Sequence, residues 1–318
     1  MIGLERLLGP TARVERSKWR VSLYQKRVVG MEGERYVLYR FFDPRTADRL
    51  LWLLNECERR AVPLQRPAAW TRSPWEALRF RGFWVATDFA RGEPILAIAS
   101  PATLAALGAA LARLHGIERE RPGSLFRIHL PWKTWQQRLQ AQLAHGLTVG
   151  ASAGESGTAG VDAQWLMAKG AFLSTLERYQ LVHGDLYGAN VLAVGDTVNL
   201  IDYEAAGFEP AGLELASVLF RDFCGGRLGL RMALLDAYLQ NCSSHLRALW
   251  EAHCAFYLAA AVLRLACRRD LRARRLTRRG RDGNDARLQA LRYADWARQL
   301  MEAERAGIAG ARALLLQI

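Results

Sequence analysis

The stretch "LVHGDLYGANVLAVGDTVNLIDYE", residues 181–204, sets one histidine, three aspartates, two asparagines and one glutamate among short apolar runs. The branched residues of LVHG and VNLIDYE predict two short β segments. Polar side chains at the ends of such segments belong either to ordinary turns or to a site for a charged ligand. His183 and Asp185, followed by Asn190 and later Asp202, favour a ligand site, because chance seldom produces this spacing.

These residue types suit the chemistry of phosphoryl transfer. That reaction needs Mg²⁺ to compensate the phosphate charge, and a carboxylate that receives the proton of the acceptor hydroxyl. Mg²⁺ prefers oxygen ligands and keeps several waters, so one carboxylate and one amide oxygen suffice beside the phosphates. Asp202 and Asn190 supply these oxygens. Asp185 lies on the same loop as Asn190 and can face the acceptor, whereas Asp196 is a plain turn residue.

The composition describes a globular, basic chain. It has 318 residues, of which half are hydrophobic, enough for one large domain or two lobes. The net charge of +13 comes from two segments: residues 264–281 hold nine arginines and one aspartate, and residues 1–40 hold nine Lys/Arg and four Glu. Such segments favour an anionic partner, although a solvated Arg-rich helix has the same composition. The absence of a secretory signal and of paired cysteines predicts a cytoplasmic protein.

The hydrophobic pattern changes along the chain. Strand-like alternation occurs in three early segments, with helical spacing over 43–61 between the second and the third. These three segments are 19–25, 35–42 and 80–89. From residue 100 onward helical spacing dominates, and the first such segment starts with Ser100-Pro101 as its cap. The pattern predicts a small sheet-based lobe followed by a larger, mostly helical one.

Together with "YVLYR", "VATDFARGEPI", "LARLHG" and "LELA", which occur in this order, residues 181–204 resemble the aminoglycoside phosphotransferase/choline kinase-like family, in its small-molecule kinase branch. The resemblance covers most of the chain. It implies an α+β, bilobal protein-kinase-like fold: a β-rich nucleotide-binding lobe with one main helix over residues 1–88, and a larger, mostly helical catalytic and substrate-binding lobe over 89–318. It also implies ATP and Mg²⁺ as cofactors and an alcohol group as acceptor.

The resemblance assigns roles to single residues. Asp185 matches the catalytic aspartate, Asn190 and Asp202 match the Mg²⁺ ligands, and His183 matches a residue that supports the catalytic loop. The inter-lobe hinge, whose backbone would bind adenine, matches Asp88, Phe89 and Ala90.

Two positions depart from the family pattern. Kinases hold the α/β-phosphates with a lysine on the third strand, and the matching residue here is Arg40. Strand alternation places Arg40 on the face of Leu38, toward the nucleotide, with Glu56 or else Glu58 as its partner; a strand-surface cation is the alternative. Glu214 stands in "LELA" where the family often has aspartate. Its extra methylene predicts that the brace of the catalytic loop is shifted or lost.

The expected function is an ATP-dependent kinase that acts on a hydroxyl of a small molecule or sugar. The basic charge favours an anionic acceptor, such as a lipopolysaccharide core sugar, over a polycationic aminoglycoside. Arg268–Arg281 would then contact an anionic membrane peripherally, at its inner face. An aminoglycoside-type antibiotic kinase and a catalytically weak kinase-like binding protein are the alternatives. Nucleic-acid binding is not favoured, because the arginine cluster lacks interleaved aromatic residues.

Overall fold

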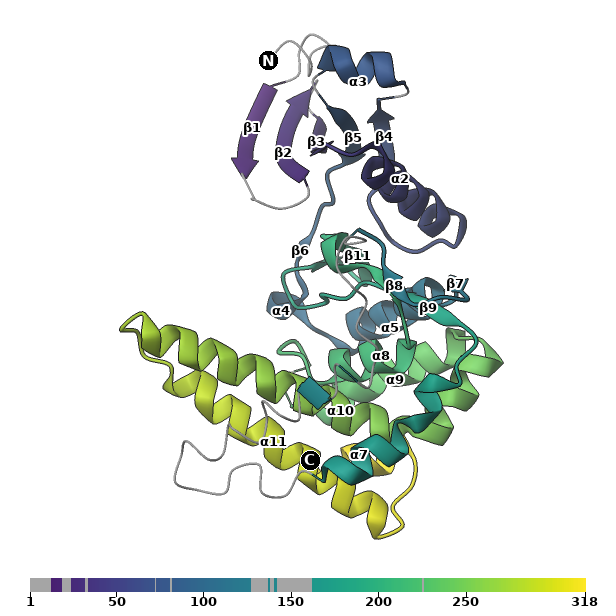
Figure 1. Cartoon of the computed structure of the whole chain (residues 1–318), viewed down its shortest axis with the longest axis vertical. Helices are drawn as coiled ribbons and strands as arrows, with labels where there is room; N and C mark the ends of the chain where they lie inside the picture. The colour runs from purple at the N-terminus through teal and green to yellow at the C-terminus, as the bar shows by residue number, and fades with distance from the viewer. Residues whose placement is uncertain are drawn as a thin grey trace.

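The structure of the chain is a computed structural model with two parts, a small sheet-based part and a larger helical part (Figure 1). It describes residues 13–18, 24–31, 34–71, 73–80, 82–126, 137, 140–141, 162–224 and 226–318. The predicted strand over 19–25 therefore lies mostly outside the described residues.

A five-stranded antiparallel sheet forms the first part, in the order β1-β2-β3-β5-β4. The strands are β1 (Arg13–Lys18), β2 (Tyr24–Met31), β3 (Glu34–Phe41), β4 (Pro67–Trp70) and β5 (Phe83–Asp88). The predicted strands over 35–42 and 80–89 are thus β3 and β5. Alternation along β3 puts Val37, Tyr39 and Phe41 in the main hydrophobic core. A short helix, α3 (Pro74–Phe80), lies at the far end of the sheet (Figure 1).

The main helix of this part is α2 (Pro44–Arg59), which follows β3 directly. Asp43 caps it by accepting hydrogen bonds from Arg45 N and Thr46 Oγ1, and Pro44 occupies its first turn. Its apolar stripe, which includes Leu50 and Leu53, is buried. These start signals account for the agreement with the helix predicted over 43–61.

The chain passes to the second part after Asp88, where β5 ends. A two-residue strand, β6 (Glu93–Pro94), then pairs with a strand of the second part. The two parts also meet elsewhere: Leu200 N donates to Pro63 O at 2.9 Å, and Arg49 Nη1 donates to Leu125 O at 3.1 Å. The segment after α2 therefore rests directly on the hairpin that carries the site.

Two small antiparallel sheets and a set of helices build the second part. One sheet joins β6 to β10 (Val191–Val194) and β11 (Thr197–Leu200); the other joins β7 (Glu118–Arg119), β9 (Tyr179–Val182), β12 (Gly207–Glu209) and β8 (Gly123–Ser124). The helices are α4 (Ile95–Ile98), α5 (Pro101–His115), α7 (Ala163–Lys169), α8 (Ala211–Leu219), α9 (Leu228–Asn241), α10 (Ser244–Arg278), α11 (Asn284–Arg305) and α12 (Ala311–Leu315), with 3₁₀ turns at Ala171–Ser174 and Tyr203–Ala205.

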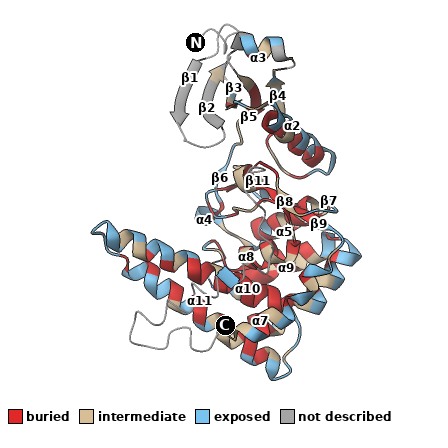
Figure 2. Ribbon diagram, in the orientation of Figure 1, coloured by how far each residue is buried: buried red, intermediate tan, exposed pale blue. Residues whose placement is uncertain are grey.

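Helix α10 is the longest helix described, and α11 packs back along it as a hairpin (Figure 1). It is long and apolar enough to cross a membrane by length and composition, but 67% of its apolar window is buried inside the fold. Figure 2 shows buried residues on the inner faces of this helix pair and exposed residues at its outer tip. Helix α10 is therefore a core helix whose arginine-rich end projects from the body.

Candidate active site

The opening stretch folds into three strands rather than the two that were predicted. It runs through β9, a loop over 183–190, β10, a turn at Gly195-Asp196 and β11. The β10–β11 hairpin pairs Val191 with Leu200, so the residues just outside that pair are neighbours. Ile201 N accordingly donates to Asn190 O at 3.0 Å. Hairpin register thus brings Asn190 next to the segment that holds Asp202, although twelve positions separate the two residues in the chain.

Asp202 and Asn190 present oxygen atoms that the protein itself leaves largely unused. Asp202 adopts a left-handed backbone conformation, φ 70° and ψ 64°, and its buried Oδ1 has no hydrogen-bond partner among the described residues. Such strained, unsatisfied groups concentrate at functional sites. Asn190 is buried and donates its Nδ2 to Asp185 O at 2.9 Å, which leaves its amide oxygen as the other polar atom. A carboxylate with an amide oxygen is a donor set that suits Mg²⁺.

Asp185 lies on the loop between these strands and is half-buried. Its carbonyl oxygen accepts from Asn190, whereas its carboxylate forms no hydrogen bond with the described residues. The carboxylate is therefore free to receive a proton from a hydroxyl placed beside it. The negative charge of Asp185 favours the charged forms of both Arg221 and Arg268.

His183 holds the loop rather than facing a ligand. Its Nε2 donates to Ile201 O at 2.9 Å, and its Nδ1 accepts from Asp185 N at 3.4 Å. The ring is buried, and burial lowers the pKa of His183 against the opposing effect of Glu214. A neutral ring with the proton on Nε2 satisfies both bonds. This geometry agrees with the supporting role expected from the resemblance.

Glu214, on α8, braces the same loop, and the expectation that its extra methylene shifts or breaks the brace is wrong. Its Oε1 accepts from Gly184 N at 2.6 Å, and its Oε2 accepts from His183 N at 2.9 Å and His115 Nε2 at 3.1 Å. Burial by itself raises the pKa of Glu214, but the hydrogen bond and charge of His115, together with the charge of His183 and the hydrogen bond from Gly184, outweigh it and lower that pKa. The longer side chain reaches both backbone N–H groups because α8 packs against β9 at that depth.

Position 184, whose backbone N–H donates to Glu214, requires glycine. Its φ is +80°, and a Cβ there would lie against Ala205 O, closer than real Cβ atoms approach. Glycine is therefore a steric requirement of the loop.

The expected phosphate-binding pair of Arg40 and Glu56 is not formed. Glu56 instead binds Arg59 and Arg60, and Glu58, the alternative, lies 3.6 Å from Arg66 Nε. The Arg40 guanidinium packs on the rings of Phe42 and Trp84, at 5.3 and 5.5 Å from their centroids.

The face of β3 that turns toward the segment after Asp202 carries Tyr39 instead, which lines a small pocket together with Tyr203 and Glu204. Burial first, and then the charges of Asp202 and Glu204, raise the pKa of Tyr39. Its hydroxyl donates to Gln65 Oε1 at 3.2 Å. Alternation correctly puts Arg40 on the face of Leu38, but Leu38 lies outside the core cluster that contains Tyr39. Only the packing of α2 shows which face of β3 turns toward the core. The strand pattern by itself therefore contains no signal that marks Tyr39.

The predicted hinge stands at the end of β5, where part of its backbone is already engaged. Asp88 N donates to Arg66 O and Phe89 N donates to Arg35 O, both at 3.0 Å. Asp88 O accepts from Gln65 Nε2 at 3.1 Å. The N–H groups of Asp88 and Phe89 are therefore not available to a purine, contrary to expectation. The N–H of Ala90 forms no hydrogen bond with the described residues.

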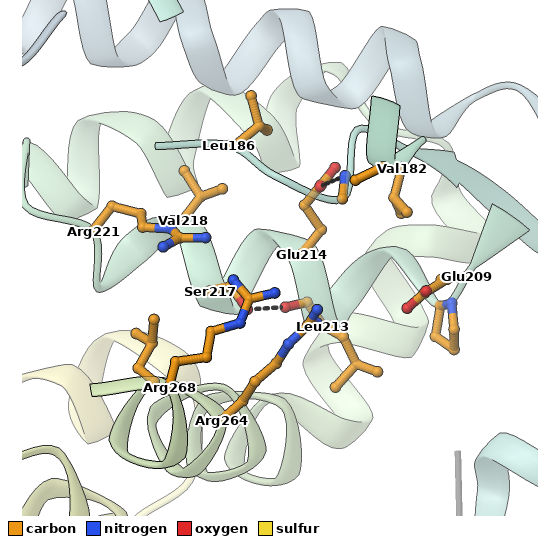
Figure 3. Close-up of a pocket in the computed structure, with 14 residues that line it drawn as sticks. Val182, Leu186, Glu209, Leu213, Glu214, Ser217, Val218, Arg221, Arg264 and Arg268 are labelled. Carbon is orange, nitrogen blue, oxygen red and sulfur yellow. Dashed lines mark hydrogen bonds between the residues drawn. The ribbon is translucent and has the colours of Figure 1, made fainter. Parts of the chain in front are cut away.

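A cluster of three arginines beside the loop was not predicted as part of the site. Arg264 and Arg268 project from one face of α10, and Arg221 follows α8 (Figure 3). The spacing of Arg264 and Arg268, four positions apart, is a signal that sequence reasoning had available, because residues i and i+4 share a helix face.

Comparison with known proteins identifies the family of this chain and its fold. The model of the phosphotransferase enzyme family matches residues 17–256. No curated protein matches the chain. An aminoglycoside phosphotransferase from Alicyclobacillus acidocaldarius is 17% identical, over 92% of each chain, with a TM-score of 0.60. A thermostable mutant of aminoglycoside phosphotransferase APH(4)-Ia, in ternary complex with AMP-PNP and hygromycin B, is 16% identical over 91% of this chain and 95% of that one, with a TM-score of 0.57.

A choline kinase from Cryptosporidium parvum is also similar in structure, at 11% identity over 96% of this chain and 94% of that one, with a TM-score of 0.53. These likenesses confirm the bilobal, kinase-like fold expected from the sequence.

Proposed function

Because the chain belongs to the phosphotransferase enzyme family, whose members phosphorylate hydroxyl groups, we propose that it is an ATP- and Mg²⁺-dependent kinase of a small molecule or sugar. The observation that carries the proposal is the buried Oδ1 of Asp202, which lies beside Asn190 and has no hydrogen-bond partner in the described part of the chain. Two oxygen donors held by hairpin register are what a Mg²⁺–nucleotide complex needs from the protein.

Each residue of the loop then has one task. The carboxylate of Asp185 accepts the proton of the acceptor hydroxyl. At the same time the oxygen of that hydroxyl forms a bond to the γ-phosphorus of ATP. The bond between that phosphorus and the β–γ bridging oxygen breaks, and ADP leaves with the bond's electron pair. Asn190 and Asp202 would hold Mg²⁺, which when bound neutralises phosphate charge. His183 and Glu214 keep the loop in this conformation through the bonds described above.

The experiment that tests the proposal separates binding from transfer. Asp185→Ala should leave the thermal shift caused by AMP-PNP and Mg²⁺ intact and should abolish ATP consumption with acceptors. Asp196→Ala is the matched control, because Asp196 is an exposed turn residue of the same segment. Equal turnover by Asp185→Ala and the unaltered chain would contradict the proposal.

A second candidate, a catalytically weak kinase-like binding protein, is favoured by one observation. Tyr39 stands on the strand face where kinases present a phosphate-binding cation, and Arg40 lies on the other face. Thermal shifts with AMP-PNP and Mg²⁺ in a chain that shows no turnover with any sugar, amino alcohol or aminoglycoside would select this candidate. An antibiotic kinase receives less support, because aminoglycosides are polycations and arginines lie beside Asp185. Hygromycin B, bound by one of the similar structures, is the probe for it.

The acceptor we propose is anionic, such as a lipopolysaccharide core sugar, and the protein would meet it at the inner face of a membrane. Within Arg268–Arg281, the exposed arginines at the projecting end of α10 support peripheral contact with anionic lipid. Cosedimentation with phosphatidylglycerol vesicles, but not with phosphatidylcholine vesicles, is expected at low salt. No binding to anionic vesicles would remove the membrane part of the proposal.

A further inference from the structure

A cavity of about 210 Å³ lies directly beside the loop that carries Asp185. Gly184 and Leu186, the two neighbours of Asp185, form one wall, and α8 and α10 form the others (Figure 3). A water molecule occupies about 30 Å³ of liquid, so this cavity has room for a group several times that size. Asp185 does not line the cavity itself, but its charge acts on Arg221 and Arg268, which do.

Three arginines direct their side chains into this cavity from two elements. Arg264 and Arg268 come from adjacent turns of α10, and Arg221 comes from the residues after α8 (Figure 3). Converging like charges repel one another. Burial, and then the charge of Arg221, lowers the pKa of Arg268; burial also lowers the pKa of Arg221, where the charge of Arg264 acts in the same direction and that of Asp185 against it. An arrangement of this kind is unfavourable unless an anion completes it.

The cavity's own carboxylates do not neutralise this cluster. Both oxygens of Glu214 are bonded to His183 N, Gly184 N and His115. Glu209 lines the cavity and favours the charged form of Arg268. If Glu209, and Asp185 beside the cavity, offset one arginine each, one of the three positive charges remains.

The atoms needed to bind an oxyanion are also present. The Nε of Arg221 is buried and has no hydrogen-bond partner among the described residues. A buried donor of this kind is costly unless something accepts its hydrogen bond. Guanidinium groups bind phosphate through paired N–H donors, and forks that approach from two walls suit a tetrahedral anion.

We propose that Arg221, Arg264 and Arg268 bind a phosphate group that the acceptor already carries, while a second group of that acceptor, a hydroxyl, faces Asp185. This inference rests on the proposed kinase function and names its substrate class: small molecules or sugars that bear a phosphate before the reaction. The product then carries two phosphate groups. An enzyme that phosphorylates the same molecule at another position must act first.

Binding of inorganic phosphate, measured by calorimetry at low salt, tests the cluster without any need for turnover. Arg268→Gln and Arg221→Gln should each weaken phosphate binding about tenfold or more, since each removes a charge-assisted fork. Arg268→Lys keeps the charge and loses the fork, so its loss should be smaller. Arg278→Gln is the control: it removes an exposed arginine about 15 Å farther along the same helix by its rise per residue.

Two results would overturn the proposal. An equal loss in Arg278→Gln would assign phosphate binding to the diffuse charge of the arginine-rich segment. Displacement of inorganic phosphate by AMP-PNP with Mg²⁺ would assign the cluster to the nucleotide. We expect instead that AMP-PNP leaves phosphate affinity unchanged and that Arg268→Gln leaves AMP-PNP affinity within about twofold. Far-ultraviolet circular dichroism confirms that each variant is folded.

Turnover then tests the substrate class. ATP consumption is compared for matched pairs, a hexose and its monophosphate, with and without Arg268→Gln. We expect consumption with the monophosphate, with a KM that rises in the variant. Consumption confined to neutral or cationic acceptors would refute the inference and leave the kinase function standing. Phosphate binding at the cluster without AMP-PNP binding or any turnover would support the anion site and remove the kinase function.

Discussion

Replacing Glu214 by glutamine tests how the loop over 183–190 is held. The two carboxylate oxygens accept from three N–H groups: Gly184 N at 2.6 Å, His183 N at 2.9 Å and His115 Nε2 at 3.1 Å. Glutamine has the same shape but only one oxygen, so its NH₂ group must face at least one of these donors. The variant therefore loses at least one hydrogen bond to a charged acceptor and leaves a buried donor unpaired.

The size of the effect follows from these two losses. A hydrogen bond to a charged group contributes about 1.5–3 kcal/mol, and a buried unpaired donor costs about 1–3 kcal/mol. The two overlap, so we expect the free energy of unfolding to fall by about 2–4 kcal/mol at pH 7. Glu120→Gln, at an exposed position, should change it by less than about 0.5 kcal/mol.

The effect should also depend on pH in a defined direction. The pKa of Glu214 in the folded chain lies below its ordinary value of 4.5, because the effects of His115, His183 and Gly184 together outweigh burial. Stabilisation by the carboxylate is therefore complete above pH 4.5 and is lost as the pH falls through the folded-state pKa. Glutamine does not titrate, so the difference between the two proteins should shrink on acidification.

Urea unfolding followed by circular dichroism, at pH 7 and at pH 4, measures both effects. Equal unfolding midpoints at pH 7 would refute the reasoning, because the brace would then contribute nothing. A difference that grows toward pH 4 would refute the assigned direction of the pKa shift.

Three further substitutions test other parts of the site. Tyr39→Lys should tighten AMP-PNP–Mg²⁺ binding several-fold in fluorescence titration, because it adds a cation on the strand face near Asp202. Arg40→Gln, on the other face, should leave this affinity unchanged. The reverse result would restore Arg40 to the site. Gly184→Ala should lower the free energy of unfolding by several kcal/mol, because the added Cβ meets Ala205 O. The urea midpoint should fall accordingly, and an unchanged midpoint would show that the turn can adjust. In the same titration, the gain in AMP-PNP affinity that Mg²⁺ produces should be about tenfold or more smaller in Asp202→Asn than in the unaltered chain. An unchanged gain would place the metal elsewhere.

Much of the fold could be predicted because its signals are local. Asp43-Pro44 and Ser100-Pro101 mark the starts of α2 and α5, and the side chains of Asp43 and Ser100 do accept the capping bonds. By contrast, β10 was missed because it has only four residues, directly after the polar loop, which is too short a run for a clear alternation pattern. Short strands such as β6 and β12 depend on partners far away in the chain, so no local pattern marks them.

The site divides in the same way. Asp185, Asn190 and Asp202 were predicted from residue type and spacing, and one loop and one hairpin do bring them together. The pairing of Arg40 with Glu56 failed because Arg59 and Arg60, one turn farther along α2, are closer to that carboxylate.

The sequence by itself determined the starts of α2 and α5, the loop that carries Asp185 and Asn190, and the class of reaction, since these depend on neighbours within a few residues of one another. Tertiary structure alone decided that Tyr39 rather than Arg40 faces the segment after Asp202, that Glu214 reaches the loop, and that Arg221 meets Arg268 across a cavity. Each of these depends on how α2, α8 and α10 pack. Packing depth and rotation are set by the whole core, and no short stretch of residues specifies them.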